Sequence, residues 1–314
     1  MYRDVADHLI LGHLPLVGIS YQGKDRDKMY FDKFSEKREM EKVIKAAYSR
    51  GINRFAAATS DSNFLSAQHI QVLREISKER EIGVIPCISI PLKLHGSEIN
   101  PYRRWSSYLK LEEECYPNVR ERVFNDPILN FRENWKERLT RAQPYKEKDF
   151  KKLTVNWSAF EGYLDEFKKL PVKSIEPGSE TDLLAATGRF DILGIIIDKI
   201  HENGYSDVIF GVHHGGITIP EMDEELGGFK GYLTPLNPDG VMMLPTKASA
   251  EDAVRNTNKE VYAIKPFAGG RVKPEDAFQY VFSFDIASCI FGAASIHEVE
   301  EDVAAALKAL SSVV

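Results

Sequence analysis

The chain has 314 residues, of which 43% are hydrophobic and 28% charged, and its formal net charge is −6. A chain of this size can bury a core without disulfides, and its acidic balance excludes the general basic footprint of a protein that binds nucleic acid or an anionic membrane. Three cysteines without metal-ligand spacing, an N-terminus without a signal-peptide pattern and the lack of a membrane-length apolar run predict a cytoplasmic protein.

Short apolar strands alternate with amphipathic helices along most of the chain. Eight strands are predicted, at residues 14–20, 52–59, 82–90, 172–176, 207–212, 231–236, 261–264 and 289–292. Helices are predicted at residues 35–50, 64–80, 158–170, 183–203, 219–226, 249–258 and 274–284, and from a Ser295–Glu298 capping box to Leu310. The alternation predicts an α/β fold, a (β/α)8 TIM barrel that includes residues 1–314 as one domain. A doubly wound sheet is the alternative.

The alternation stops after the third predicted strand. Residues 91–152 are rich in charged and aromatic side chains and are too long for a plain connection, so they predict a helical insertion or lid. Arginines and glutamates interleave there, which favours amphipathic helices over a site for single-stranded nucleic acid. The insertion is also the expected surface for a homo-oligomer.

Polar residues follow several of the predicted strands, where a barrel forms its site. These residues are Ser20, Asp61, Glu176, His213, His214, Asn237 and Lys265. Glu176 ends an apolar strand, so burial is expected to raise its pKa and suit it to acid–base catalysis; an ion pair with Lys173 or Lys265 is the alternative. Lys265 could be an amine of depressed pKa or the partner of a carboxylate across the barrel.

His213 and His214 are adjacent, and adjacent strand residues face opposite sides. At most one of them is therefore expected to point into the site, and a structural histidine is the alternative. A metal needs several converging ligands, which the sequence does not bring together, so no metal is predicted. Asn237 begins an Asn-Pro-Asp-Gly run that is typical of a turn.

Glycines follow the last two predicted strands, at Gly269, Gly270 and Gly292. A glycine loop before a helix N-terminus can hold an anion, because unpaired N–H groups and the helix dipole point there. The alternative is that these glycines only turn the chain.

The order of several motifs resembles the aldo-keto reductase superfamily. The resembling segments are residues 51–58 (GINRFAAA), 210–214 (FGVHH), 233–237 (LTPLN), 262–270 (YAIKPFAGG) and 292–302 (GAASIHEVEED). The resemblance covers most of the chain outside the insertion, and it implies a barrel whose strand ends carry an Asp, a Tyr, a Lys and a His for carbonyl reduction.

The chain departs from that catalytic set. Ala56 stands at the Asp position and Asp61 near the Tyr position. Cys87 and its neighbours replace the Lys, while Glu176 stands at the His position. The resemblance therefore implies catalytic positions at Glu176 and Asp61, and His213 and Lys265 join them as the nearest polar candidates.

The same resemblance implies a nicotinamide cofactor. His213 and His214 match the residues that hold its carboxamide, and Ile264 matches the ring on which it stacks. The positions assigned to cofactor binding are His214, Asn237, Gly269, Gly270, Arg271, Gly292, Ala294 and Ser295. Acidic residues from Glu298 to Asp302 would repel a 2′-phosphate, which favours NAD, or another phosphate-bearing ligand, over NADP. Alternatively, these acidic residues are only the solvent-exposed first turn of a helix, where negative charge is favourable.

Three hypotheses follow. The first is a divergent aldo-keto reductase-like barrel that binds NAD or NADP and has atypical or lost carbonyl-reductase chemistry on a small molecule. The second is another barrel enzyme, a lyase, an isomerase or a metal-assisted hydrolase, that uses Glu176, His213 and Lys265. The third is a non-catalytic protein for ligand binding or assembly, with the insertion as its docking surface.

Overall fold

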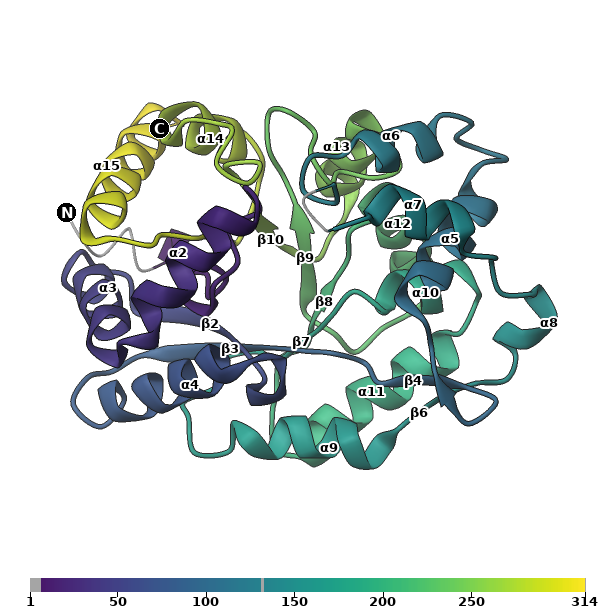
Figure 1. The fold of residues 1–314 in the computed structure, drawn as a ribbon, viewed down its shortest axis with the longest axis horizontal. Coiled ribbons are helices and arrows are strands. Elements are labelled where there is room, and N and C mark those ends of the chain that lie inside the picture. The colour runs from purple at the N-terminus through teal and green to yellow at the C-terminus, as the bar shows by residue number, and fades with distance from the viewer. Residues whose placement is uncertain (1–6, 131–132, 314) are drawn as a thin grey trace.

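A barrel of parallel strands forms the centre of the computed structural model, which describes residues 7–130 and 133–313 (Figure 1). The eight strands are β1 (Leu9–Leu11), β2 (Arg54–Ala58), β3 (Gly83–Ile88), β7 (Glu176–Pro177), β8 (Ile209–Gly211), β9 (Gly231–Pro235), β10 (Glu260–Ile264) and β11 (Ser288–Phe291). They are hydrogen-bonded in the order β7-β3-β2-β1-β11-β10-β9-β8. A parallel bridge between Ile175 and Val208 joins the two end strands. The predicted (β/α)8 barrel is confirmed.

Helices surround this barrel. They are α2 (Lys24–Ser35), α3 (Lys37–Ser49), α4 (Phe64–Ile76), α9 (Trp157–Glu166), α10 (Thr181–Ala186), α11 (Phe190–Glu202), α12 (Gly215–Glu225), α13 (Lys247–Asn256), α14 (Pro274–Val281) and α15 (Ile296–Val313). Their apolar faces follow helical spacing, as in α3, where Met40, Val43, Ile44 and Ala47 are buried. No helix within the described residues is both long and apolar enough to span a membrane.

Both faces of the strands are buried, which explains their nearly continuous apolar runs. One face of each strand points inward and forms a separate core cluster. Its buried members are Ile10, Ala56, Ile85, Ile209, Leu233, Tyr262 and Ile290. The other face packs under the helices in the larger core. Branched and aromatic side chains thus fill the barrel, and the site must lie at its mouth.

Two predicted elements differ from the structure. The first strand is Leu9–Leu11 rather than residues 14–20, because Leu9–Leu11 pairs with β11 while Pro15–Val17 forms the 3-10 turn η1. Pro15 has no N–H for a strand ladder, and Gly18 ends the turn with φ 85°. The predicted helix 183–203 is two helices, α10 and α11, because Gly188 adopts φ 66° between them.

The insertion begins and ends in a small antiparallel sheet of β4 (Leu92–Leu94), β5 (Ser97–Glu98) and β6 (Leu153–Val155). Four helices lie between these strands: α5 (Pro101–Glu112), α6 (Val119–Asn125), α7 (Trp135–Arg141) and α8 (Glu147–Phe150). Figure 1 shows α5, α6 and α7 on the same side of the barrel as α10, α12 and α13, with α8 farther out. Trp105 and Tyr108 are buried and pack against His214 of the barrel, while the buried Trp135 packs against Trp105 within the insertion. The insertion therefore forms a fixed wall on one side of the mouth.

Candidate active site at the barrel mouth

Glu176 is the first residue of the two-residue strand β7, and it pairs with Cys87 next to the end of β3, with its carboxyl group buried. It is 6% exposed, and a β-carbon added at Gly211 would lie 1.8 Å from its Oε1 atom. The absence of a side chain at Gly211 on the neighbouring strand β8 thus makes room for the carboxyl group. Burial raises the pKa of Glu176 to about 8, although a hydrogen bond with Cys87 and the charge of Lys265 act in the opposite direction. The carboxyl group can therefore gain or lose a proton near neutral pH.

Lys265 follows β10 and points to the same mouth. Its Nζ atom lies 3.3 Å from Nε2 of His213, the second residue after β8. The backbone of Lys265 has φ 56°, in the left-handed region. Its Nζ atom also lies 5.4 Å from the centre of the Tyr21 ring, which supplies a cation–π contact. The structure therefore brings together Lys265, His213 and Glu176, three of the four predicted catalytic residues.

Asp61, the fourth, lies in the 3-10 turn η2 (Ser60–Ser62) and is exposed. Its carboxylate accepts a hydrogen bond from Tyr163 of α9, and together with burial this raises the pKa of that tyrosine. The described contacts do not link Asp61 with Lys265 or His213. Its catalytic role stays a prediction from the resemblance.

The His214 ring has other partners than the His213 ring, but strand alternation is not the reason, because β8 ends at Gly211 before both histidines. Its ring is buried, and Nδ1 lies 2.5 Å from Oε1 of Glu112 in the insertion. The rings of Trp105 and Tyr108 pack against it at 5.2 and 4.7 Å. Burial acts to lower the pKa of His214, but the Glu112 carboxylate outweighs it and the pKa is raised. This imidazole connects the insertion to the barrel and does not face the mouth.

Asp182 of α10 fixes the two-histidine loop. Its carboxylate accepts the backbone N–H of His213 at 2.8 Å and that of His214 at 3.2 Å. It also accepts the Thr218 hydroxyl at 2.8 Å. Asp182 is 2% exposed, and burial raises its pKa. A buried carboxylate held by three donors in this way orients His213 toward Lys265.

The groups assigned to the nicotinamide end are engaged within the protein. His214 is bonded to Glu112 as described. The side chain of Asn237 closes a turn, because its Nδ2 donates to the carbonyl of Val241 and its Oδ1 accepts the N–H of Val241, both at 2.9 Å. Neither side chain is directed to a ligand.

The groups assigned to the phosphate end are engaged as well. The Ala294 N–H donates to Glu298 Oε2 at 2.5 Å, and Ser295 Oγ accepts the N–H of Glu298 at 3.1 Å. Arg271 donates to the carbonyls of Tyr21, Ala268 and Gly269. A β-carbon at Gly292 would lie 2.8 Å from Pro15. The residues present therefore do not fit a nicotinamide nucleotide in this conformation.

Sequence reasoning missed several residues at the mouth. Cys87 is hydrogen-bonded to Glu176, and burial raises the pKa of its thiol. Burial lowers the pKa of His13 to about 4, with a further contribution from Lys265, and that of His69 to about 3. His13 is the second residue after β1, so a correctly placed first strand would have marked it as a residue at a strand end. His69 lies on a helix face, where its spacing alone gives no signal.

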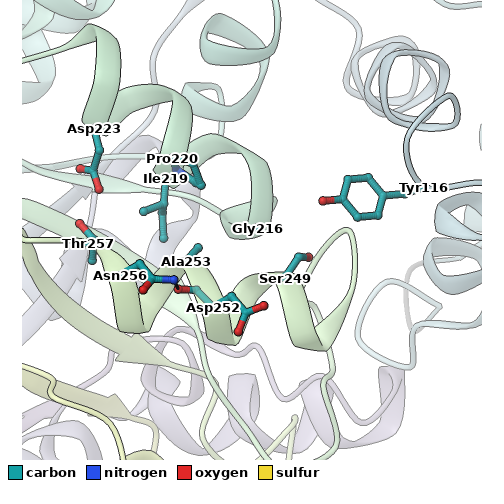
Figure 2. Close-up of a pocket in the computed structure, with 10 residues that line it drawn as sticks. All are labelled: Tyr116, Gly216, Ile219, Pro220, Asp223, Ser249, Asp252, Ala253, Asn256 and Thr257. Atoms are coloured by element: carbon teal, nitrogen blue, oxygen red, sulfur yellow. Dashed lines mark hydrogen bonds between the residues drawn. The ribbon is translucent and has the colours of Figure 1, made fainter.

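A shallow groove lies away from the mouth, between α12 and α13 (Figure 2). Its lining includes Asp223, Ser249 and Asp252, and Tyr116 of the insertion faces it. It contains none of the predicted catalytic residues. No group of three or more His, Cys, Asp or Glu side chains in the described part of the chain could hold a metal ion. The candidate catalytic residues therefore lie outside this groove.

Known proteins resemble the chain in structure. No family model matches it, and no curated protein matches its sequence. A solved Pseudomonas aeruginosa structure assigned to the aldo-keto reductases has a TM-score of 0.53 and 12% identity, over 96% of this chain and 90% of that chain. A glycerol dehydrogenase from Gluconobacter oxydans has a TM-score of 0.50 and 12% identity, over 97% and 90%. At this identity the match establishes the fold, and the chain has the (β/α)8 fold of the aldo-keto reductases.

Proposed function

We propose that this chain is a divergent aldo-keto reductase-like barrel enzyme that catalyses proton transfer next to the carbonyl group of a small molecule. The observation that supports this most is the Lys265–His213 pair, 3.3 Å apart, beside the buried carboxyl group of Glu176. All three come from strand ends at the mouth, where barrel enzymes place their catalytic groups. The proposed reaction class is isomerisation through an enolate.

Glu176 is the acid–base group of this proposal. A carboxyl group with a pKa of about 8 is partly ionised at neutral pH, so it can remove a proton from the carbon next to the carbonyl. In a hydroxyaldehyde or hydroxyketone, the protonated carboxyl group then returns that proton to the former carbonyl carbon of the enediolate, while the proton of the neighbouring hydroxyl group moves to the former carbonyl oxygen. Proton removal and return balance, so the reaction consumes no other reactant.

Lys265 stabilises the charge that forms. As Glu176 removes the proton, negative charge develops on the carbonyl oxygen, and the Lys265 ammonium is placed to donate a hydrogen bond to it. His213 Nε2 accepts another N–H of the same ammonium and so fixes its direction. Asp182 acts through the backbone of His213 and is a positioning residue in this proposal.

Exchange of carbon-bound protons tests the proposal without a known product. Small hydroxyaldehydes and hydroxyketones are incubated with the protein in D2O, and loss of the proton next to the carbonyl is followed by NMR. Lys265→Met should slow the exchange by about 100-fold or more. The control is Lys230→Met, because Lys230 lies at the opposite end of the barrel, 2.8 Å from Asp207. Exchange that is absent from the wild-type protein, or lost equally in the control, would refute the proposal.

Nicotinamide-dependent carbonyl reduction is the second candidate. Its support is the ordered motif resemblance together with the structural match to a glycerol dehydrogenase. It comes second because the residues assigned to the cofactor bond to other parts of the chain. Titration with NAD(H) and NADP(H) tests it directly.

A further inference from the structure

The groove that the resemblance assigns to a nucleotide is filled by the chain itself. We infer that residues 15–35, here named the β1–α2 segment, are the built-in occupant of this groove, so that the protein works without NAD or NADP. This inference goes beyond the proposed function, which concerns Lys265, His213 and Glu176. It depends on contacts at two places, the glycine loop after β10 and the start of α15.

At the glycine loop, the segment lies directly on the backbone. A β-carbon added at Gly270 would lie 2.3 Å from Nε2 of Gln22, and one added at Gly269 would lie 3.1 Å from the β-carbon of Tyr21. From the other side, Cγ1 of Ile128 in the insertion would lie 3.3 Å from the same position at Gly269. The glycines thus allow close approach, but protein atoms make that approach, so a diphosphate at this loop would have to displace the Gln22 amide and pass the Tyr21 β-carbon.

At the start of α15, the Glu298 carboxylate occupies the position at which a phosphate of a ligand would bind. Glu298 Oε2 accepts the Ala294 N–H at 2.5 Å, while Lys33 of α2 donates to the Ala294 carbonyl at 2.6 Å. Arg26 of α2 lies 4.0 Å from the Glu298 carboxylate. A phosphate brought to this helix terminus would therefore have to displace the Glu298 carboxylate, because that carboxylate already accepts the Ala294 N–H.

The segment is anchored firmly enough to stay in the groove. Phe34 is fully buried and Tyr30 is 6% exposed, so α2 is part of the core. Before the helix, the Ser20 N–H and hydroxyl donate to Asp27 at 2.7 and 2.6 Å. Removing α2 from the groove would expose both aromatic rings and break these bonds.

Nucleotide titration combined with hydrogen exchange tests the inference. The full-length protein is titrated with NADH and NADPH by calorimetry, and amide exchange in residues 15–35 is measured with and without each nucleotide. We expect no saturable binding up to about 1 mM and exchange that neither nucleotide changes. Saturable binding of either nucleotide would overturn the inference, and faster exchange in the segment on binding would identify it as a movable lid.

Two variants test the contacts that hold the segment. Lys33→Ala and Glu298→Ala should each raise amide exchange at the end of α2 and the start of α15 by about tenfold. Lys28→Ala is the matched control, because Lys28 forms an exposed pair with Asp32 on the same helix. Equal exchange in all three variants would refute the anchoring. Proton exchange on carbonyl compounds without nucleotide is a separate measurement, so this inference and the proposed function can fail independently.

Discussion

The buried carboxyl group of Glu176 predicts a specific dependence of stability on pH. Its pKa is about 8 in the folded protein, against an ordinary pKa of 4.5 for a glutamate, so the folded state holds this proton more tightly than the unfolded state. Stability from this group is therefore fully present below about pH 4.5 and is lost as the pH rises through about 8. One pKa unit corresponds to about 1.4 kcal/mol, so the loss between pH 5 and pH 8 is roughly 3 kcal/mol.

Glu176→Gln isolates this effect, because the amide has the shape of the protonated carboxyl group but does not ionise. The free energy of unfolding of both proteins is measured by urea denaturation from pH 5 to pH 9. The two proteins should be similar at pH 5, and the variant should become the more stable by roughly 3 kcal/mol at pH 8. Glu114→Gln, at an exposed position of the insertion, is the control. If the free energies of unfolding of the wild type and of Glu176→Gln change with pH in the same way from pH 5 to pH 9, this reasoning is refuted.

Three further predictions concern packing and assembly. Gly211→Ala places a β-carbon against the Glu176 carboxyl group and should destabilise the fold by about 1–3 kcal/mol in urea denaturation, whereas Gly194→Ala, in open space on α11, should not. Glu112→Ala removes the carboxylate that contacts the buried His214, so it should lower the free energy of unfolding by about 3 kcal/mol. Glu112→Gln should lower it by less. Thermal unfolding of both variants measures these losses. A homo-oligomer through residues 91–152 stays a prediction, and light scattering of the full chain tests it; a monomer would contradict it.

The barrel could be predicted because its strands and helices have hydrophobic patterns within short stretches of the sequence. Buried strands such as β3 are short runs of mostly apolar residues, and helices such as α3 have apolar residues at helical spacing. The first strand was placed too late because Leu9–Leu11 is a three-residue element defined by its partner β11, not by its own pattern. Helix α2 was missed for a similar reason: only two of its residues, Tyr30 and Phe34, are buried.

The candidate site could be predicted only in part. The places of Glu176, His213 and Lys265 follow from strand ends, but the directions of His213 and His214 do not follow from strand alternation, because both residues lie beyond the end of β8 at Gly211. The partner of His214 could not be predicted, because Glu112 is 102 positions away in the chain. The filling of the nucleotide groove depends on equally distant contacts, such as Lys33 with Ala294, and no local pattern reveals them.

In the proposed mechanism, Glu176 transfers a proton at a site organised by Lys265. The most direct measurement is the pH dependence of proton exchange on a carbonyl compound, in the absence of nucleotide, for the wild-type protein and Glu176→Gln. The account predicts a wild-type rate that rises with pH to a plateau with an apparent pKa near 8, and a variant rate at least about 100-fold lower throughout. An unchanged profile in Glu176→Gln would contradict it.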